Sequence, residues 1–246
     1  MTWIQRDVAQ FVIILMAVSV FSLYWFVSSS KAFDARVRQR IDPAGIKKPL
    51  AQKYLGTLLL GGLPALLVWM LMGKSPSEWG LGVPDWQATL VWGSILSLCA
   101  LPVPYFSARA RDMQAFYPQV RAMEWNGQLV AQNGLAWMIY LLAYEFLFRG
   151  LLVIGSASLS NPWTAVALSS ALATATHIPK GAKETFATVP YSLLLGFVAL
   201  ETGSVWAGYL SHICLAIAND YWAVLFNPEM RFVREGARSR VGAPMP

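Results

Sequence analysis

Residues 129–156 read LVAQNGLAWMIYLLAYEFLFRGLLVIGS, an apolar run that contains the charged residues Glu145 and Arg149. About 17–25 predominantly apolar residues cross a bilayer as one helix. Ionised side chains are costly at that depth, so a charged pair inside a span is by default a functional-site hypothesis. The i,i+4 spacing puts both residues on one helical face, where they can pair. A structural salt bridge that fixes helix packing accounts for the pair equally well at this stage.

Composition assigns the whole chain to the polytopic membrane proteins. Of its 246 residues, 56% are hydrophobic and 13% are charged, whereas soluble domains carry roughly 25% charged residues. Apolar runs recur along the chain and predict an all-α transmembrane helix bundle of about seven spans, within a range of about six to eight. The predicted spans are residues 8–28, 54–72, 88–106, 129–156, 161–177, 185–200 and 204–226.

Prolines and one asparagine predict local features of these helices. Pro64 predicts a kink, and Pro102 with Pro104 predicts a break in the third run. Asn161 followed by Pro162 predicts a helix N-terminus, because Asn caps free N–H groups and proline suits the first helical position. The sixth run is short and contains Pro190.

The basic residues predict the orientation. The net charge of +6 comes from loops between the apolar runs, so we expect contact with the lipid bilayer and not with nucleic acid. Lysines and arginines crowd every second loop and the C-terminal end, which places the N-terminus outside and the C-terminus in the cytoplasm, in a bacterial inner membrane. Residues 229–246 are expected to form a basic, disordered cytoplasmic tail. Cys99 and Cys214 lie in apolar runs and predict reduced thiols.

A few more polar residues lie in or beside the apolar runs. The chain has two histidines, and both fall here. His177 ends the fifth run, where a lone histidine is more often a cap than a catalyst. His212 lies inside the seventh, with Asp220 eight residues later on the same face. The rise per residue of a helix gives the depth of each residue in the membrane. By this measure Glu145 lies nearer to the depth of His212, and His177 lies close to the depth of Asp220. The plain interpretation of Glu184, after His177, is a solvated loop charge.

These residue types allow a limited chemistry. A carboxylate with two histidines and a second acid can activate water and stabilise the oxyanion that forms. Glu145, His177 and His212 could instead bind a metal such as Zn²⁺, although the chain has no His-Glu-x-x-His motif. No nucleophile elbow supports serine or cysteine catalysis. The sequence leaves metal-free and zinc-dependent chemistry both open.

The order and spacing of these residues resemble the CAAX-prenyl-protease and bacteriocin-processing family of intramembrane proteases, also called the Abi family. Its motifs are Glu-Glu-x-x-x-Arg, Phe-x-x-x-His and His-x-x-x-Asn/Asp. Here Tyr144-Glu145-x-x-x-Arg149 is similar to the first, Ala173-x-x-x-His177 to the second, and His212 to the histidine of the third. The resemblance covers about residues 130–225 and implies an intramembrane endopeptidase.

Two positions depart from that pattern. Tyr144 stands where the family's usual base stands, and Ala216 stands where the third motif has Asn or Asp. The chain also resembles a variant subset, in which a single glutamate is followed by His-x-x-Lys-x-x-x-Glu and by an acid eight residues after the last histidine. That resemblance makes Glu184 and Asp220 candidate site residues.

The resulting prediction divides the chain into residues 1–126, which are unassigned transmembrane helices, a CAAX-protease-like core at 127–228, and the tail. In the core, Glu145 activates water, His177 assists, and His212 with Asp220 forms the oxyanion or orienting side. Arg149 pairs with Glu145 or locks the helix, and Glu184 is a reserve base. The expected substrate is a membrane-associated or prenylated protein or peptide. The alternative is a catalytically degenerate scaffold or a bacteriocin-immunity-type binding protein. A transporter is disfavoured by the short sixth run and the lack of an inverted repeat.

Overall fold

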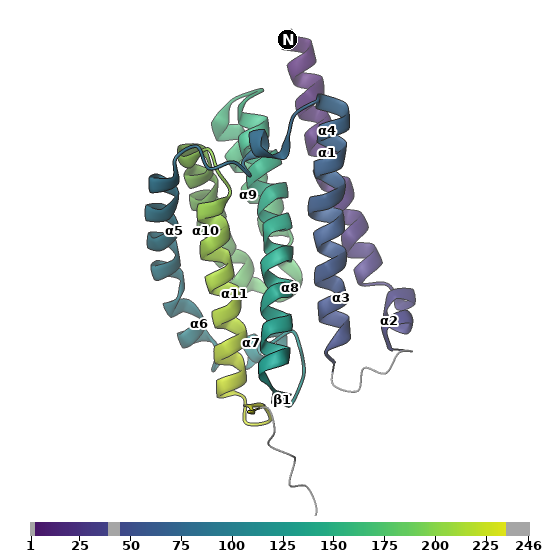
Figure 1. Cartoon of the computed structure of the whole chain (residues 1–246), viewed down its shortest axis with the longest axis vertical. Coiled ribbons are helices and arrows are strands. Elements are labelled where there is room, and N and C mark those ends of the chain that lie inside the picture. Colours follow the sequence, from purple (N-terminus) through teal and green to yellow (C-terminus); the bar gives the residue numbers. More distant parts are fainter. Residues whose placement is uncertain (1–2, 39–44, 235–246) are drawn as a thin grey trace, which may run out of the picture.

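The chain folds into a bundle of helices, shown in Figure 1 as a computed structural model that describes residues 3–38 and 45–234. The prediction of an all-α helix bundle is confirmed. In chain order the elements are α1 Trp3–Ser28, α2 Lys31–Arg38, α3 Lys47–Gly56, the π-helix η1 Thr57–Gly62, α4 Leu63–Met72, η2 Pro76–Trp79, α5 Trp86–Ala100, α6 Pro102–Ser107, α7 Arg111–Phe116, β1 Glu124–Trp125, α8 Gly127–Glu145, the π-helix η3 Phe146–Gly155, α9 Pro162–Ala175, η4 Ile178–Lys180, α10 Ala182–Thr202, α11 Trp206–Phe226 and β2 Arg231–Phe232.

Each predicted apolar run is helical, but the runs differ in their capacity to cross a bilayer. By length and composition, helices long and apolar enough to do so cover Gln5–Ser28, Lys47–Met72, Trp86–Ser107, Gly127–Gly155 and Ala182–Thr202. The helix α11 has 21 residues, but polar side chains such as His212 and Asp220 lower its hydropathy. The 14-residue helix α9 is about 21 Å long, short of the ~30 Å hydrocarbon core.

Prolines and an asparagine cap lie at or inside several of these helices. The helix α5 ends at Ala100 and α6 begins at Pro102, as predicted. Asn161 caps α9, because its side chain accepts a hydrogen bond from the N–H of Trp163 at 2.8 Å. The sixth run is a 21-residue helix with Pro190 in its interior. The length of this helix is therefore no argument against a transporter. The lack of an inverted repeat in the sequence still disfavours one.

The continuous α8–η3 segment is the centre of the bundle. Its apolar window is 72% buried, compared with 22–33% for the other four candidate spans. In Figure 1, α8 lies between α11 and α3, and η3 packs on α1, α9 and α10. Glycine allows the close approach of η1, since a Cβ on Gly61 would lie 2.7 Å from the Cβ of Ala143. Helices from residues 1–126 thus pack directly on those of residues 127–228.

Two segments predicted as loop or tail contain regular structure. The strand β2 pairs in parallel with β1, so the segment after α11 begins with a strand; residues 235–246 of the predicted tail lie outside the described residues. The basic segment after the first span contains α2 and the start of α3. Lys53 belongs to α3 and is buried, with 2% of its surface exposed, whereas Arg40 lies outside the described residues.

Candidate active site

Glu145 occupies the junction between α8 and η3. A π-helix inside a longer helix is frequently found at a functional site, and η3 begins at the next residue. The side chain of Glu145 is fully buried. Its Oε1 lies 2.7 Å from Nδ1 of His212 on α11, and its Oε2 lies 3.3 Å from Nε of Arg149. The depth comparison that put Glu145 nearer His212 agrees with this contact.

Arg149 joins this carboxylate to a third helix. Its guanidinium is 2% exposed, and Nη2 donates a hydrogen bond to Ser192 on α10 at 3.1 Å. The ion pair therefore ties helices to one another, as the structural interpretation predicts, and the functional interpretation stays a prediction.

The backbone of α11 leaves space for this carboxylate at Gly208. A Cβ added there would lie 3.2 Å from Oε2 of Glu145. We expect Gly208→Ala to push the carboxylate away from His212 and to destabilise the fold by about 1–3 kcal/mol through overpacking. Gly134→Ala is the matched control, because nothing lies within 4 Å of its added Cβ and alanine favours helix by about 0.5–1 kcal/mol. Thermal unfolding in detergent measures the stability of both variants. Equal unfolding temperatures for the two variants would contradict this packing.

His177 belongs to a second cluster, beyond the end of α9. Its Nδ1 lies 2.9 Å from the carbonyl oxygen of Ala173, which assigns the proton to Nδ1, since a carbonyl only accepts. Its Nε2 lies 3.8 Å from Oε1 of Glu184. The same Oε1 accepts hydrogen bonds from Nζ of Lys180 at 2.7 Å and from the hydroxyl of Tyr117 at 3.0 Å. Glu184 is therefore part of a hydrogen-bonded cluster.

Tyr144 lies between the two clusters. Its hydroxyl is 3.2 Å from Oγ1 of Thr176, which is itself 3.1 Å from Nδ1 of His177. The ring of Tyr144 stands edge-on to that of His212, with centroids 5.5 Å apart. The residue that replaces the family's first glutamate thus contacts both histidine clusters. Its position next to Glu145 is the sequence signal for this contact, although the sequence alone shows only that a tyrosine replaces the glutamate.

The second cluster has perturbed proton affinities. Burial alone would lower the pKa of Lys180, but Tyr117 and Glu184 raise it. Burial raises the pKa of Tyr117 to about 12. Burial first, and then the charge of Lys180, lower the pKa of His177 to about 3. Lys180 is therefore charged and His177 neutral at neutral pH.

The low pKa of His177 predicts a pH dependence of stability. In the unfolded chain an imidazole has a pKa of about 6.5, so the unfolded state binds the proton first as the pH falls. This contribution to stability is complete above about pH 6.5 and is lost progressively towards pH 3. Labelled-histidine NMR can follow the two imidazoles, with His177→Gln giving the assignment. Titration of the His177 signal between about pH 6 and 7 would contradict the prediction.

Asp220 is not brought to His212. Eight residues of helix separate the two by about 12 Å along α11. Oδ2 of Asp220 instead accepts hydrogen bonds from Asn133 at 2.8 Å and from Trp137 at 2.6 Å, both on α8. The predicted grouping of Asp220 with His212 is therefore wrong, because side chains of the neighbouring helix satisfy the carboxylate at its own depth.

The predicted metal ligands do not converge. Among the residues that the structure describes, no three His, Cys, Asp or Glu side chains are grouped as ligands for one ion. His212 binds Glu145, whereas His177 faces Glu184. The donor set of Glu145, His177 and His212 therefore does not fit a zinc ion in this arrangement.

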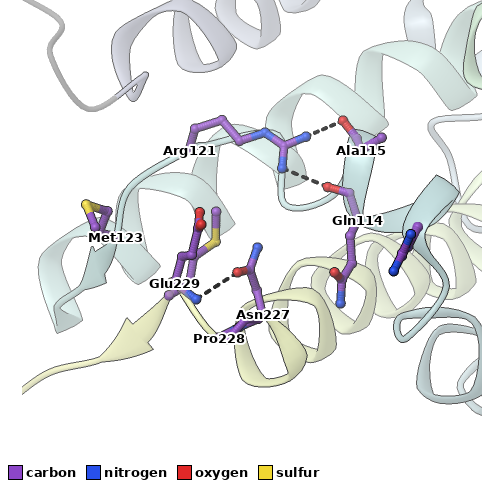
Figure 2. A pocket seen from close by; sticks show the side chains of 9 residues that line it. Gln114, Ala115, Arg121, Met123, Asn227, Pro228 and Glu229 are labelled. Carbon is purple, nitrogen blue, oxygen red and sulfur yellow. Dashed lines mark hydrogen bonds between the residues drawn. The ribbon is translucent and has the colours of Figure 1, made fainter.

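A separate pocket of about 500 Å³ lies at the C-terminal end of α11 (Figure 2). Arg121 crosses it and donates to the carbonyl oxygens of Gln114 and Ala115 at the end of α7. The pocket is lined by Arg111, Gln114, Ala115, Arg121, Met123, Asn227, Pro228, Glu229 and Met230. It contains no predicted site residue, so the chemistry proposed from the sequence belongs elsewhere, around Glu145.

Comparison with known proteins assigns the central segment. Residues 126–218 match the family described as type II CAAX prenyl endopeptidase Rce1-like. No curated protein and no solved structure matches the chain. The matched residues run from the N-cap of α8 into α11 and include Glu145, His177 and His212, but stop before Asp220. With its long apolar helices, the chain is an integral membrane protein, and its segment 126–218 is similar to the CAAX-prenyl-protease and bacteriocin-processing family.

Proposed function

We propose that this protein is an intramembrane endopeptidase in which Glu145 activates the water that cleaves a membrane-associated or prenylated protein or peptide. The family match over residues 126–218 supports a CAAX-protease-like hydrolase. The observation that carries the proposal is the buried carboxylate of Glu145, held 2.7 Å from His212 in the middle of the bundle. Burial and a fixed hydrogen-bond partner are two means by which enzymes tune and position a general base.

In the proposed reaction, the Glu145 carboxylate takes a proton from water while the water oxygen attacks the peptide carbonyl carbon. The carbonyl oxygen becomes an oxyanion, and the proton then passes to the leaving amine as the C–N bond breaks. Because an ionised carboxylate can only accept, Nδ1 of His212 donates to it. Nε2 of His212 is then the nitrogen available to the water or the leaving group. Arg149, whose Nε lies 3.3 Å from Oε2 of Glu145, orients the carboxylate.

His177 and Glu184 are proposed to assist from the second cluster. The contacts from Tyr144 through Thr176 to His177 support this role, since they connect that cluster to the helix turn bearing Glu145. A neutral His177 offers Nε2 as a hydrogen-bond acceptor, and Glu184 lies beside that nitrogen. Asp220 has no part in the reaction as proposed, and its role is to hold α11 against α8.

The direct test is cleavage of defined peptides by the purified protein in lipid vesicles. Farnesylated peptides with a free C-terminus, and unprenylated peptides with an apolar segment, would be compared by mass spectrometry. Cleavage of either supports the proposal and identifies the substrate class. A protein that cuts neither, together with His177→Ala and His212→Ala variants that keep the cellular phenotype, would favour the non-enzymatic scaffold. The distribution of Lys and Arg supports a cytoplasmic C-terminus in a bacterial inner membrane, which accessibility labelling can check.

A further inference from the structure

A third group of buried polar residues takes no part in the proposed reaction. It consists of Lys53 on α3, Asn133 and Trp137 on α8, and Asp220 on α11, each 5% exposed or less. Lys53 precedes the family-matched segment and Asp220 follows it. Charged groups buried among transmembrane helices require compensation, so these residues need a physical explanation of their own.

The four side chains form an incomplete network. Trp137 donates through Nε1 to Oδ2 of Asp220 at 2.6 Å, and the ammonium of Lys53 lies 4.2 Å from the centre of the Trp137 ring. Lys53 and Asp220 therefore contact the same indole, the ammonium over its face and the carboxylate at its N–H edge. No salt bridge of 4.0 Å or less joins them among the residues that the structure describes.

Three buried polar atoms in this group have no hydrogen-bond partner of good geometry within the described chain: Nζ of Lys53, Oδ1 of Asn133 and Oδ1 of Asp220. The backbone N–H of Gln119 approaches Asp220 as well, but Oδ1 still has no bond that meets the geometric limits. The set comprises one donor and two acceptors. Leaving such groups unpaired in the interior costs about 1–3 kcal/mol each, and more for charged groups.

We propose that Lys53, Asn133 and Asp220 form a closed hydration site inside the bundle. One ordered water accepts a hydrogen bond from the Lys53 ammonium and donates its two protons to Asn133 and Asp220. Buried waters typically make about three hydrogen bonds to groups of this kind. The water completes the ion pair between α3 and α11 across α8. It thereby links the N-terminal helices to the protease-like segment, and this inference does not depend on peptidase activity.

X-ray hydroxyl-radical footprinting tests the site, because radicals form from water bound beside a side chain even when bulk solvent is excluded. Trp137 is expected to be oxidised. Trp125 is the matched dry control, since it is 3% exposed, packs in an apolar cluster and bonds the carbonyl oxygen of Ala122. Exposed Trp163 is the positive control. Oxidation of Trp137 should be lost in Lys53→Met/Asp220→Asn, which neutralises both charges together.

Two results would overturn the proposal. If Trp137 in the native protein is oxidised as little as Trp125, the site holds no water. Oxidation of Trp137 that is unchanged in the folded double variant means that other groups hold the water. If the double variant does not fold, Asn133→Leu replaces it, and oxidation of Trp137 must then fall for the proposal to stand.

Discussion

Glu145→Gln is expected to lower the rate of peptide cleavage by about 10²–10⁴-fold, the usual contribution of a positioned general base. Glutamine has nearly the same shape but cannot take the proton from water. The variant also loses the charge that pairs with Arg149 at 3.3 Å. Single-turnover cleavage in vesicles under excess enzyme measures this effect separately from substrate binding.

Glu201→Gln is the matched control for this substitution. Glu201 is an exposed residue near the C-terminal end of α10, so its neutralisation should leave cleavage unchanged. Equal activity of the two variants would remove Glu145 from the reaction. In that event Glu184, the other glutamate beside a histidine, becomes the base to examine.

Arg149→Met is expected to destabilise the protein by about 3–5 kcal/mol, because it leaves the Glu145 carboxylate buried with one partner fewer. Methionine roughly preserves the volume of the side chain while removing its charge and the bond to Ser192. Reversible unfolding in mixed detergent, followed by far-ultraviolet circular dichroism, measures the loss.

The double variant Glu145→Gln/Arg149→Met separates charge from packing. With neither charge present, no buried charge is left unpaired, so stability should return towards that of the native protein. The double variant should nevertheless remain inactive. A double variant that is less stable than Arg149→Met alone would show that packing around Arg149, and not its ion pair, stabilises this region.

The helices were predictable because their signal is local. An apolar run of spanning length can be recognised from the sequence of that run alone. Asn161 and Pro102 mark helix boundaries because they change the backbone hydrogen bonds of their own segment. Where helices begin was less clear. The predicted second span started at residue 54, whereas the structure starts α3 at Lys47, because polar residues extend the helix beyond its apolar part. Lys53, one residue before the predicted span, therefore lies inside this helix and not in a loop.

The candidate site was predictable along each helix but not between helices. Spacing gave the Glu145–Arg149 pair, and depth suggested that Glu145 is near His212. A shared helical face predicts the grouping of Asp220 with His212, but it does not say which neighbouring helix supplies the partners, and the carboxylate binds Asn133 and Trp137. Tyr117 was missed for the same reason, since only the fold brings it to Glu184.

Hydrolysis in ¹⁸O-labelled water tests the central claim most directly. The purified protein would be incubated in lipid vesicles with the best-cut peptide, and the new C-terminus would be analysed by mass spectrometry. The proposed mechanism predicts one ¹⁸O atom in the new carboxyl group with the native protein, and no labelled product above background with Glu145→Gln. Labelled product formed equally fast by the Glu145→Gln variant, or no cleavage of any membrane peptide by the native protein, would contradict it.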